Sequence, residues 1–195
     1  MKKEKKNKSY FAILRTAKEL FWKHGVSRIT VEEICREASV SKMTFYRLFK
    51  NKNDVAAVVL SNYFDEVSND YDQIMKEDIS FAEKMRRLVI LKQQESDNLS
   101  EEFIKDIFLK EDSILKEKIE QLQEIRKNVF IKHIKEAQEK GEIRSDIKLE
   151  FIIYMLNSMT EMIFKPEIQE IYPNVHKAIM EITNFFFYGL SQNNE

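Results

Sequence analysis

Five side chains that can hydrogen-bond to a base edge or touch one lie within six residues near the amino end of the chain. They are Lys42, Met43, Thr44, Tyr46 and Arg47, and they face outward if residues 42–48 form a helix. Lys and Arg donate to O6 and N7 of guanine, while Met or the Thr methyl group can contact the thymine methyl group, at about 1–3 kcal/mol per good contact. This pattern predicts a helix that lies in the major groove of duplex DNA.

Neighbouring residues are suited to binding phosphates. Thr30 and Lys52 lie at the amino ends of predicted helices, where free N–H groups and the helix dipole favour an anion. Such contacts fix the position of a protein on DNA without reading its sequence. Ser41, the predicted N-cap of the base-reading helix, completes the predicted DNA-binding set. The lysines among residues 1–8 could follow the DNA backbone or enter the minor groove, raising affinity at low salt.

The residues around this set predict a helix-turn-helix. Residues 30–52 contain two short helical patterns joined by a tight turn, after a helix that ends at Gly25 and before a longer helix. Thr30 and Glu33 have the spacing of a capping box, in which each side chain satisfies the other residue's free backbone N–H. A helix-turn-helix presents its second helix to the major groove, so the elements and the candidate contacts agree.

The segment from residue 13 to residue 60 resembles the amino-terminal domain of the TetR (tetracycline-repressor-like) family of transcriptional regulators. The matching stretches are ILRTAKELFWKHG and ITVEEICREASVSKMTFYRLFKNKNDV, about a quarter of the chain. The resemblance implies that the Tyr46 hydroxyl contacts a phosphate. Two residues depart from the family pattern: Ser39 stands where the family usually has a turn glycine, at modest strain if its backbone is left-handed, and Met43 is bulky for its position.

Composition favours an all-α fold of about nine helices. The 195 residues include only 3 Gly and 2 Pro, and chains rich in sheet need more turns than these residues supply. All three glycines fall at predicted helix ends. We expect a three-helix DNA-binding domain over residues 1–53, beginning with a flexible basic arm over residues 1–8, and a larger helical ligand-binding and dimerisation domain over residues 54–195.

Charge is distributed unevenly along the chain. Residues 1–53 hold 14 Lys and Arg against 5 Asp and Glu, whereas the remaining residues hold 18 against 28. A basic amino-terminal segment followed by an acidic remainder is typical of a protein that binds a polyanion with one end. The amino-terminal lysines alone could be a solvated tail, but the basic residues inside the helix-turn-helix are not explained in that way.

Other classes of protein are disfavoured. The chain has no H-E-x-x-H, G-x-S-x-G, glycine-rich phosphate loop or C-x-x-C, and its three histidines fall on separate predicted helices. We therefore expect neither an enzyme nor a metal or cofactor site. The chain also lacks an apolar run long enough to span a membrane, and a secretory signal is not expected. The single cysteine, Cys35, is predicted to be buried, which fits a cytoplasmic protein.

The last two predicted helices are candidates for dimerisation, because apolar residues cover more than one face of each. A second copy of the chain is the expected partner, and a twofold homodimer would bind an inverted repeat in double-stranded DNA. The predicted interface residues are Phe151, Tyr154, Met162, Phe185, Phe186 and Tyr188.

The resemblance also implies a small-molecule pocket among the middle helices. Apolar stripes of this kind form ordinary core as well, so core packing remains an alternative for each lining residue. The candidate lining residues are Phe81, Met85, Phe103, Ile107, Phe130, Met155 and Met159.

Taken together, these patterns predict a ligand-responsive transcriptional repressor that binds a palindromic operator as a homodimer. A small apolar or amphipathic effector molecule would release it from DNA. The alternative is a helical protein-interaction or ligand-carrying module whose basic amino-terminal segment binds acidic partners without reading DNA sequence.

Overall fold

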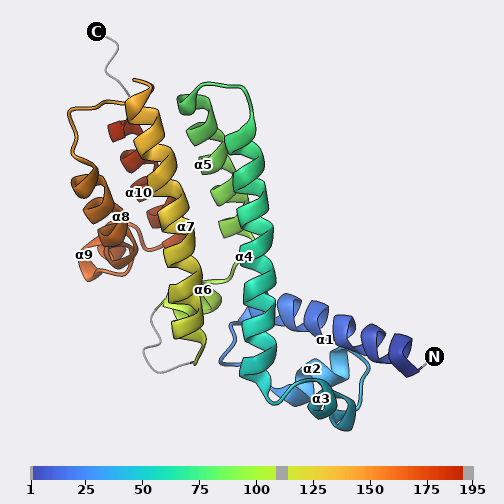
Figure 1. The fold of residues 1–195 in the computed structure, drawn as a ribbon. Coiled ribbons are helices and arrows are strands. Elements are labelled where there is room, and N and C mark those ends of the chain that lie inside the picture. Colours follow the sequence, from blue (N-terminus) through green and yellow to red (C-terminus); the bar gives the residue numbers. More distant parts are fainter. Residues whose placement is uncertain (1, 109–113, 191–195) are drawn as a thin grey trace. The chain divides into compact units, whose positions relative to one another are not determined.

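The computed structural model describes the backbone of residues 2–108 and 114–190, and within these ranges the chain forms ten α-helices (Figure 1). This architecture confirms the all-α prediction. The helices are α1 (Lys2–His24), α2 (Val31–Glu37), α3 (Lys42–Leu48), α4 (Lys52–Lys76), α5 (Phe81–Asp97), α6 (Glu101–Phe108), α7 (Ile114–Glu139), α8 (Leu149–Ile163), α9 (Pro166–Ile171) and α10 (Val175–Leu190).

The helices differ from the predicted ones in three respects: the start of α1, an additional helix, and the end of α10. The expected flexible arm is part of α1, which begins at Lys2; lysine and glutamate are good helix formers, so a lysine-rich start need not be a coil. The additional helix is α9, which has Pro166 in its first turn, where the missing N–H costs nothing. Gly25 and Gly141 end α1 and α7 with φ of 78° and 71°, as predicted, whereas α10 runs through Gly189.

Contacts divide the chain into two compact units. The first unit comprises residues 1–68 and 98–124, and the second comprises residues 69–97 and 125–195. This division differs from the boundary expected after residue 53, because α6 and the start of α7 pack with the helices at the amino end.

The core of the first unit holds α1, α2, α3 and α6 together. Trp22 of α1 packs against Phe103 of α6, with 4.4 Å between ring centroids, and meets the ring of Tyr63 edge-on at 5.3 Å. The backbone N–H of Ser100 donates to the carbonyl of Trp22, which ties the start of α6 to α1. The most deeply buried side chains are Ile13, Phe21, Ile34, Phe45, Val55 and Leu60.

The core of the second unit is apolar, with two polar pairs crossing between helices. Tyr71 Oη lies 2.7 Å from His133 Nδ1, and Ser96 Oγ lies 2.7 Å from His176 Nδ1. Burial lowers the pKa of His133, so this imidazole is neutral near pH 7. Helix α10 packs against both α5 and α8, which places it at the centre of the unit. The core side chains are Phe81, Met85, Ile134, Ile152, Phe186 and Leu190.

None of the helices in the described ranges is both long and apolar enough to cross a lipid bilayer. The same residues contain no group of three or more His, Cys, Asp and Glu side chains placed to hold a metal ion.

Candidate DNA-binding surface

The helix-turn-helix is formed by side-chain caps at the start of each short helix. Thr30 Oγ1 accepts from the Glu33 backbone N–H at 3.2 Å, and the Glu33 carboxylate accepts from the Thr30 N–H at 2.8 Å, which confirms the capping box. Ser41 Oγ accepts from the Thr44 N–H at 3.1 Å and lies 3.0 Å from the Thr44 hydroxyl, leaving Thr44 half-buried. Ser39 has a φ of 53°, so the turn does take the left-handed conformation that usually favours glycine.

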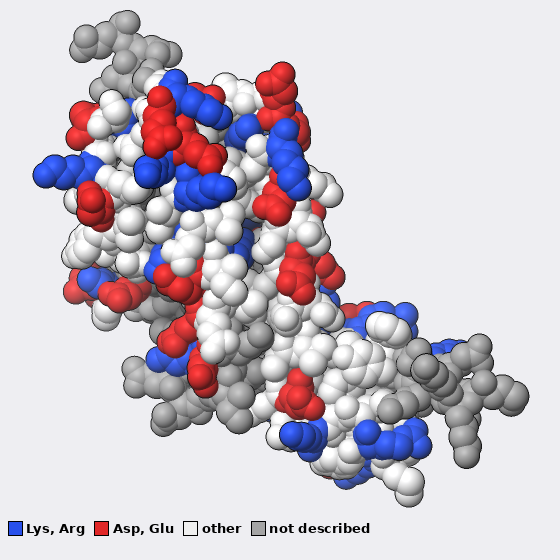
Figure 2. Space-filling view, viewed as in Figure 1, with Lys and Arg blue, Asp and Glu red and all other residues white. Residues whose placement is uncertain are grey.

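Helix α3 buries one face and presents the other to solvent. Phe45 is fully buried and anchors the helix to the core. The ring of Tyr46 lies edge-on to it, with 5.4 Å between the two ring centroids. Met43 is 81% exposed and Tyr46 is 56% exposed, which is unusual for large apolar or aromatic side chains. Lys42 and Arg47 are exposed as well. Figure 2 shows Lys and Arg side chains on the surface of this region of the first unit. Four of the five side chains predicted to face outward from this helix are therefore exposed, and the fifth, Thr44, is half-buried.

An ion pair links the two helices of the motif. Lys42 Nζ lies 2.5 Å from Glu32 Oε1, and this contact lowers the pKa of Glu32 and raises the pKa of Lys42. Glu32 was not among the predicted site residues. Glu32 lies in the first turn of α2, and the first turn of α3 faces it across a short turn. An acidic and a basic residue at these two places are the signal that could have identified it.

Lys52 has structural partners that were not predicted. Its ammonium group donates to the backbone carbonyls of Val26, Ser27 and Ile29, at 2.7, 3.1 and 2.6 Å. These carbonyls belong to the loop between α1 and α2, so Lys52 joins the start of α4 to that loop. The phosphate contact expected of Lys52 remains a prediction, and the structure adds a second role in fixing the loop.

Removing the Lys52 charge is expected to destabilise the fold. Lys52→Met keeps most of the aliphatic stem but leaves three carbonyls without their donor, and hydrogen bonds to charged groups contribute about 1.5–3 kcal/mol. We expect urea unfolding to give a free energy of unfolding lower by about that amount. Lys50→Met, at an exposed neighbouring lysine, should change it by less than about 0.5 kcal/mol. Equal effects of the two substitutions would contradict the structural role of Lys52.

Comparison with known proteins identifies the motif. Residues 13–59 match the sequence model described as "Bacterial regulatory proteins, tetR family", a segment that contains all of α2 and α3. The segment that carries the helix-turn-helix is thus similar to regulators of the TetR family. This match confirms the resemblance predicted from the sequence, over residues 13–59.

Curated relatives match the chain over its amino-terminal part. Uncharacterized HTH-type transcriptional regulators of Mycobacterium tuberculosis (strain H37Rv) and Mycobacterium bovis are each 30% identical to it over 81 residues, which is 38% of this chain and 43% of each relative. The match thus spans less than half the length of these relatives.

Solved structures share the fold over nearly the whole chain. The fatty acid degradation regulator FadR from Bacillus halodurans has a TM-score of 0.70 at 18% identity, over 93% of this chain and 96% of that one. SmeT, the repressor of a Stenotrophomonas maltophilia multidrug efflux pump, has a TM-score of 0.69 at 18% identity, over 95% and 91%. FadR from Bacillus subtilis, solved with stearoyl-CoA, has a TM-score of 0.67 at 17% identity, over 93% and 99%.

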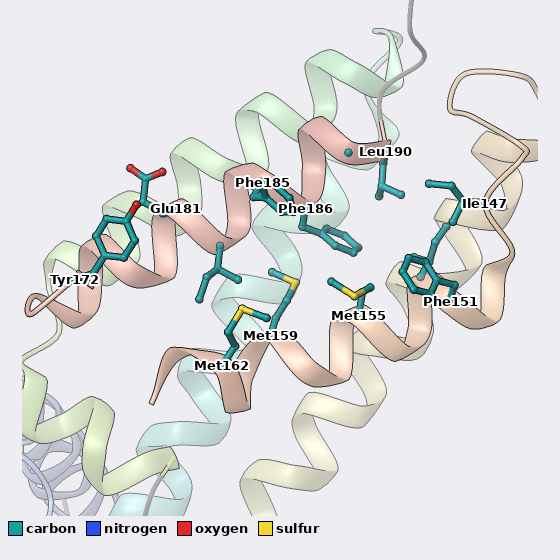
Figure 3. Close-up of a pocket in the computed structure, with 13 residues that line it drawn as sticks. Ile147, Phe151, Met155, Met159, Met162, Tyr172, Glu181, Phe185, Phe186 and Leu190 are labelled. Atoms are coloured by element: carbon teal, nitrogen blue, oxygen red, sulfur yellow. The ribbon is translucent and has the colours of Figure 1, made fainter. Parts of the chain in front are cut away.

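The second unit of the chain carries an open apolar hollow between α8 and α10. Its volume is about 360 Å³, and in Figure 3 Met155, Met159 and Met162 of α8 point toward α10, with Phe186 opposite Met155. Tyr172 and Glu181 lie at one end of the hollow and are the polar side chains that line it within the described ranges. Four aromatic side chains of the same two helices are exposed: Phe151 (56%), Tyr154 (66%), Phe185 (79%) and Tyr188 (79%).

The predicted dimer and ligand residues overlap at this hollow. Met155 and Met159, predicted as ligand-lining, border it together with four predicted interface residues, Phe151, Met162, Phe185 and Phe186. Phe186 is also part of the core of the second unit.

The remaining predicted ligand residues are divided between the two units. Phe81, Met85 and Phe130 lie in the core of the second unit, as do Met155 and Met159. Phe103 and Ile107 instead pack in the core of the first unit. The structure therefore does not gather all seven residues into one cluster.

Proposed function

We propose that this protein is a homodimeric repressor of the TetR family that binds an inverted repeat in duplex DNA and is released by a small effector molecule. The observation that carries the proposal is the exposed outer face of α3, where Met43 and Tyr46 stand in solvent above the buried Phe45. Large side chains held outward on a fixed helix add little to the folded core of the monomer, so they are available to contact base edges and phosphates in a DNA groove.

The DNA contacts divide by chemistry. Lys42, Met43 and Arg47 contact base edges, with Thr44 supporting the start of the helix through its bond to Ser41. The Tyr46 hydroxyl contacts a phosphate. Thr30, Ser41 and Lys52 lie beside helix amino ends, where a phosphate would be stabilised by backbone N–H groups and would fix the register of the protein on the duplex.

The second copy of the chain covers the apolar face of α8 and α10. A contiguous exposed apolar face is typical of an interaction surface. The predicted interface residues all lie on these two helices: Phe151, Tyr154, Met162, Phe185, Phe186 and Tyr188. Pairing through this face would give the two α3 helices a twofold relation. Linking two weak DNA contacts raises affinity by about 10²–10⁴-fold through effective concentration.

The effector is proposed to be an apolar or amphipathic small molecule that binds in the second unit. The protein is proposed to act in the cytoplasm. The flexible Met85, Met155 and Met159 side chains can adapt to such a ligand. FadR from Bacillus subtilis, which shares the fold, was solved with stearoyl-CoA, an amphipathic molecule, so an acyl-CoA is a suitable first probe. The ligand can shift DNA affinity only by its difference in affinity for the two states.

Selection from random duplexes tests the proposal. The wild-type protein should enrich an inverted repeat whose half-sites lie about one helical turn apart, or a multiple of it. Tyr46→Ala and Tyr46→Phe should each bind the enriched duplex at least about tenfold more weakly, since both lose a hydroxyl bond to a charged phosphate, and Tyr46→Phe keeps the ring. A folded wild-type protein that enriches no sequence would overturn the proposal and support the alternative interaction module.

A further inference from the structure

The ion pair between Glu32 and Lys42 places a hydrogen-bond acceptor beside a donor on the surface proposed to face DNA. The two side chains come from different helices, α2 and α3, and their charged atoms are 2.5 Å apart. Glu32 is 56% exposed and Lys42 is 58% exposed, so both groups remain accessible to a base pair.

A G·C base pair offers the matching arrangement in the major groove. The N4 amino group of cytosine is a donor, and it lies next to the O6 acceptor of guanine, with N7 of guanine beyond. A carboxylate accepts from cytosine N4, and an ammonium group donates to guanine O6 and N7. Lys has three donors, so Lys42 can keep its bond to Glu32 while donating to guanine.

We infer that Glu32 is a specificity-determining residue, and that Glu32 and Lys42 together read one G·C base pair in each half-site. This inference rests on the proposed function, because it needs α3 to lie in the major groove.

Folding explains the position of Glu32 only in part, because a carboxylate in the first turn of α2 gains only a modest stabilisation from the helix dipole. The capping box of α2 uses the neighbouring Glu33, whose carboxylate holds the Thr30 N–H. An ion pair between exposed side chains adds little to stability. A carboxylate on a DNA-facing surface also repels phosphates, and its pKa is lowered by Lys42, so it stays charged at neutral pH. Glu32 therefore opposes non-specific binding, and an amino group on a base edge compensates for its charge. Of the amino groups in the major groove, N4 of cytosine is the one with which a carboxylate typically pairs.

Glu32→Ala should relax sequence preference and strengthen non-specific binding. At one position of each half-site, the preference for G·C over the other base pairs should fall by about tenfold. Lys42, no longer paired, becomes available to a phosphate, so the plot of log affinity against log salt should steepen by about 0.9 for each half-site.

Glu37→Ala is the matched control. Glu37 also lies on α2 and also forms an exposed ion pair, with Arg36 at 3.0 Å, but its partner is on the same helix and α3 is not involved. This variant should keep the base preferences of the wild-type protein. Thermal unfolding of both variants verifies that each is folded.

Selection from random duplexes with the three proteins separates the outcomes. A wild-type protein without any sequence preference would refute the proposed function itself. If the wild-type protein and Glu32→Ala enrich the same inverted repeat with the same preference at every position, the proposed function stands and the inference about Glu32 is wrong. An A·T preference lost in Glu32→Ala would equally overturn the G·C assignment.

Discussion

Replacing both Phe185 and Tyr188 with glutamate is expected to give a folded monomer that binds the selected duplex about 10²–10⁴-fold more weakly than the wild-type protein. Both side chains are 79% exposed, so neither contributes much to the core of its own unit. In the proposed dimer they are buried against the second copy, and a charge buried there without a partner is strongly unfavourable. The loss of affinity follows because each monomer engages only one half-site.

Light scattering on a sizing column measures the mass, and circular dichroism measures the helix content of the same sample. Ile125→Glu is the control: Ile125 is 63% exposed on α7, outside the predicted interface, and this variant should remain a dimer. A double variant that keeps the dimer mass, or a wild-type protein that is a monomer at the same concentration, would contradict the assignment of the α8–α10 face.

Gly25→Ala is expected to destabilise the protein by more than Gly141→Ala. Both glycines have left-handed backbone, so alanine at either position costs about 1–2 kcal/mol. A Cβ atom at Gly141 meets nothing within 4 Å, whereas at Gly25 it would lie 2.7 Å from Asp106 Oδ2 and 3.3 Å from the backbone carbonyl carbon of Glu102. We expect a further loss of about 1–3 kcal/mol at Gly25, the typical cost of overpacking.

The contact that Gly25 permits is specific. The Asp106 carboxylate of α6 accepts from the Ser27 N–H at 2.8 Å and from the Ser27 hydroxyl at 2.6 Å, in the loop after α1. Urea unfolding measures the free energy of unfolding of both variants. Gly141→Ala reports the cost of backbone strain alone, and Gly25→Ala reports that cost together with the displacement of α6. If both variants lose the same free energy of unfolding, the close packing of α6 against this loop contributes nothing measurable to stability.

Local sequence patterns were sufficient to predict the helix-turn-helix. The Thr30–Glu33 capping box, the Ser41 cap and the Gly25 helix end are interactions between residues at most four positions apart, so their spacing is visible in the sequence. The outward face of α3 followed from the same periodicity, because Phe45 could only be inside.

Contacts between distant segments were not visible in the same way. Lys52 meets carbonyls 23 to 26 residues away, and no pattern in its own neighbourhood indicates them. Phe103 and Ile107 were assigned to a ligand pocket because their spacing shows only that they are buried. Helical periodicity indicates which side of a helix is covered but not which neighbour covers it.

The packing of α6 on α1 limits how the DNA-binding head can be transplanted. A chimeric regulator that carries only residues 1–53 onto a foreign sensor would leave Trp22 without Phe103 and Ser27 without Asp106. A chimera that keeps these contacts would therefore have to include residues 98–124 as well. The smallest transferable DNA-binding domain of this protein is thus encoded by two separate segments of the gene.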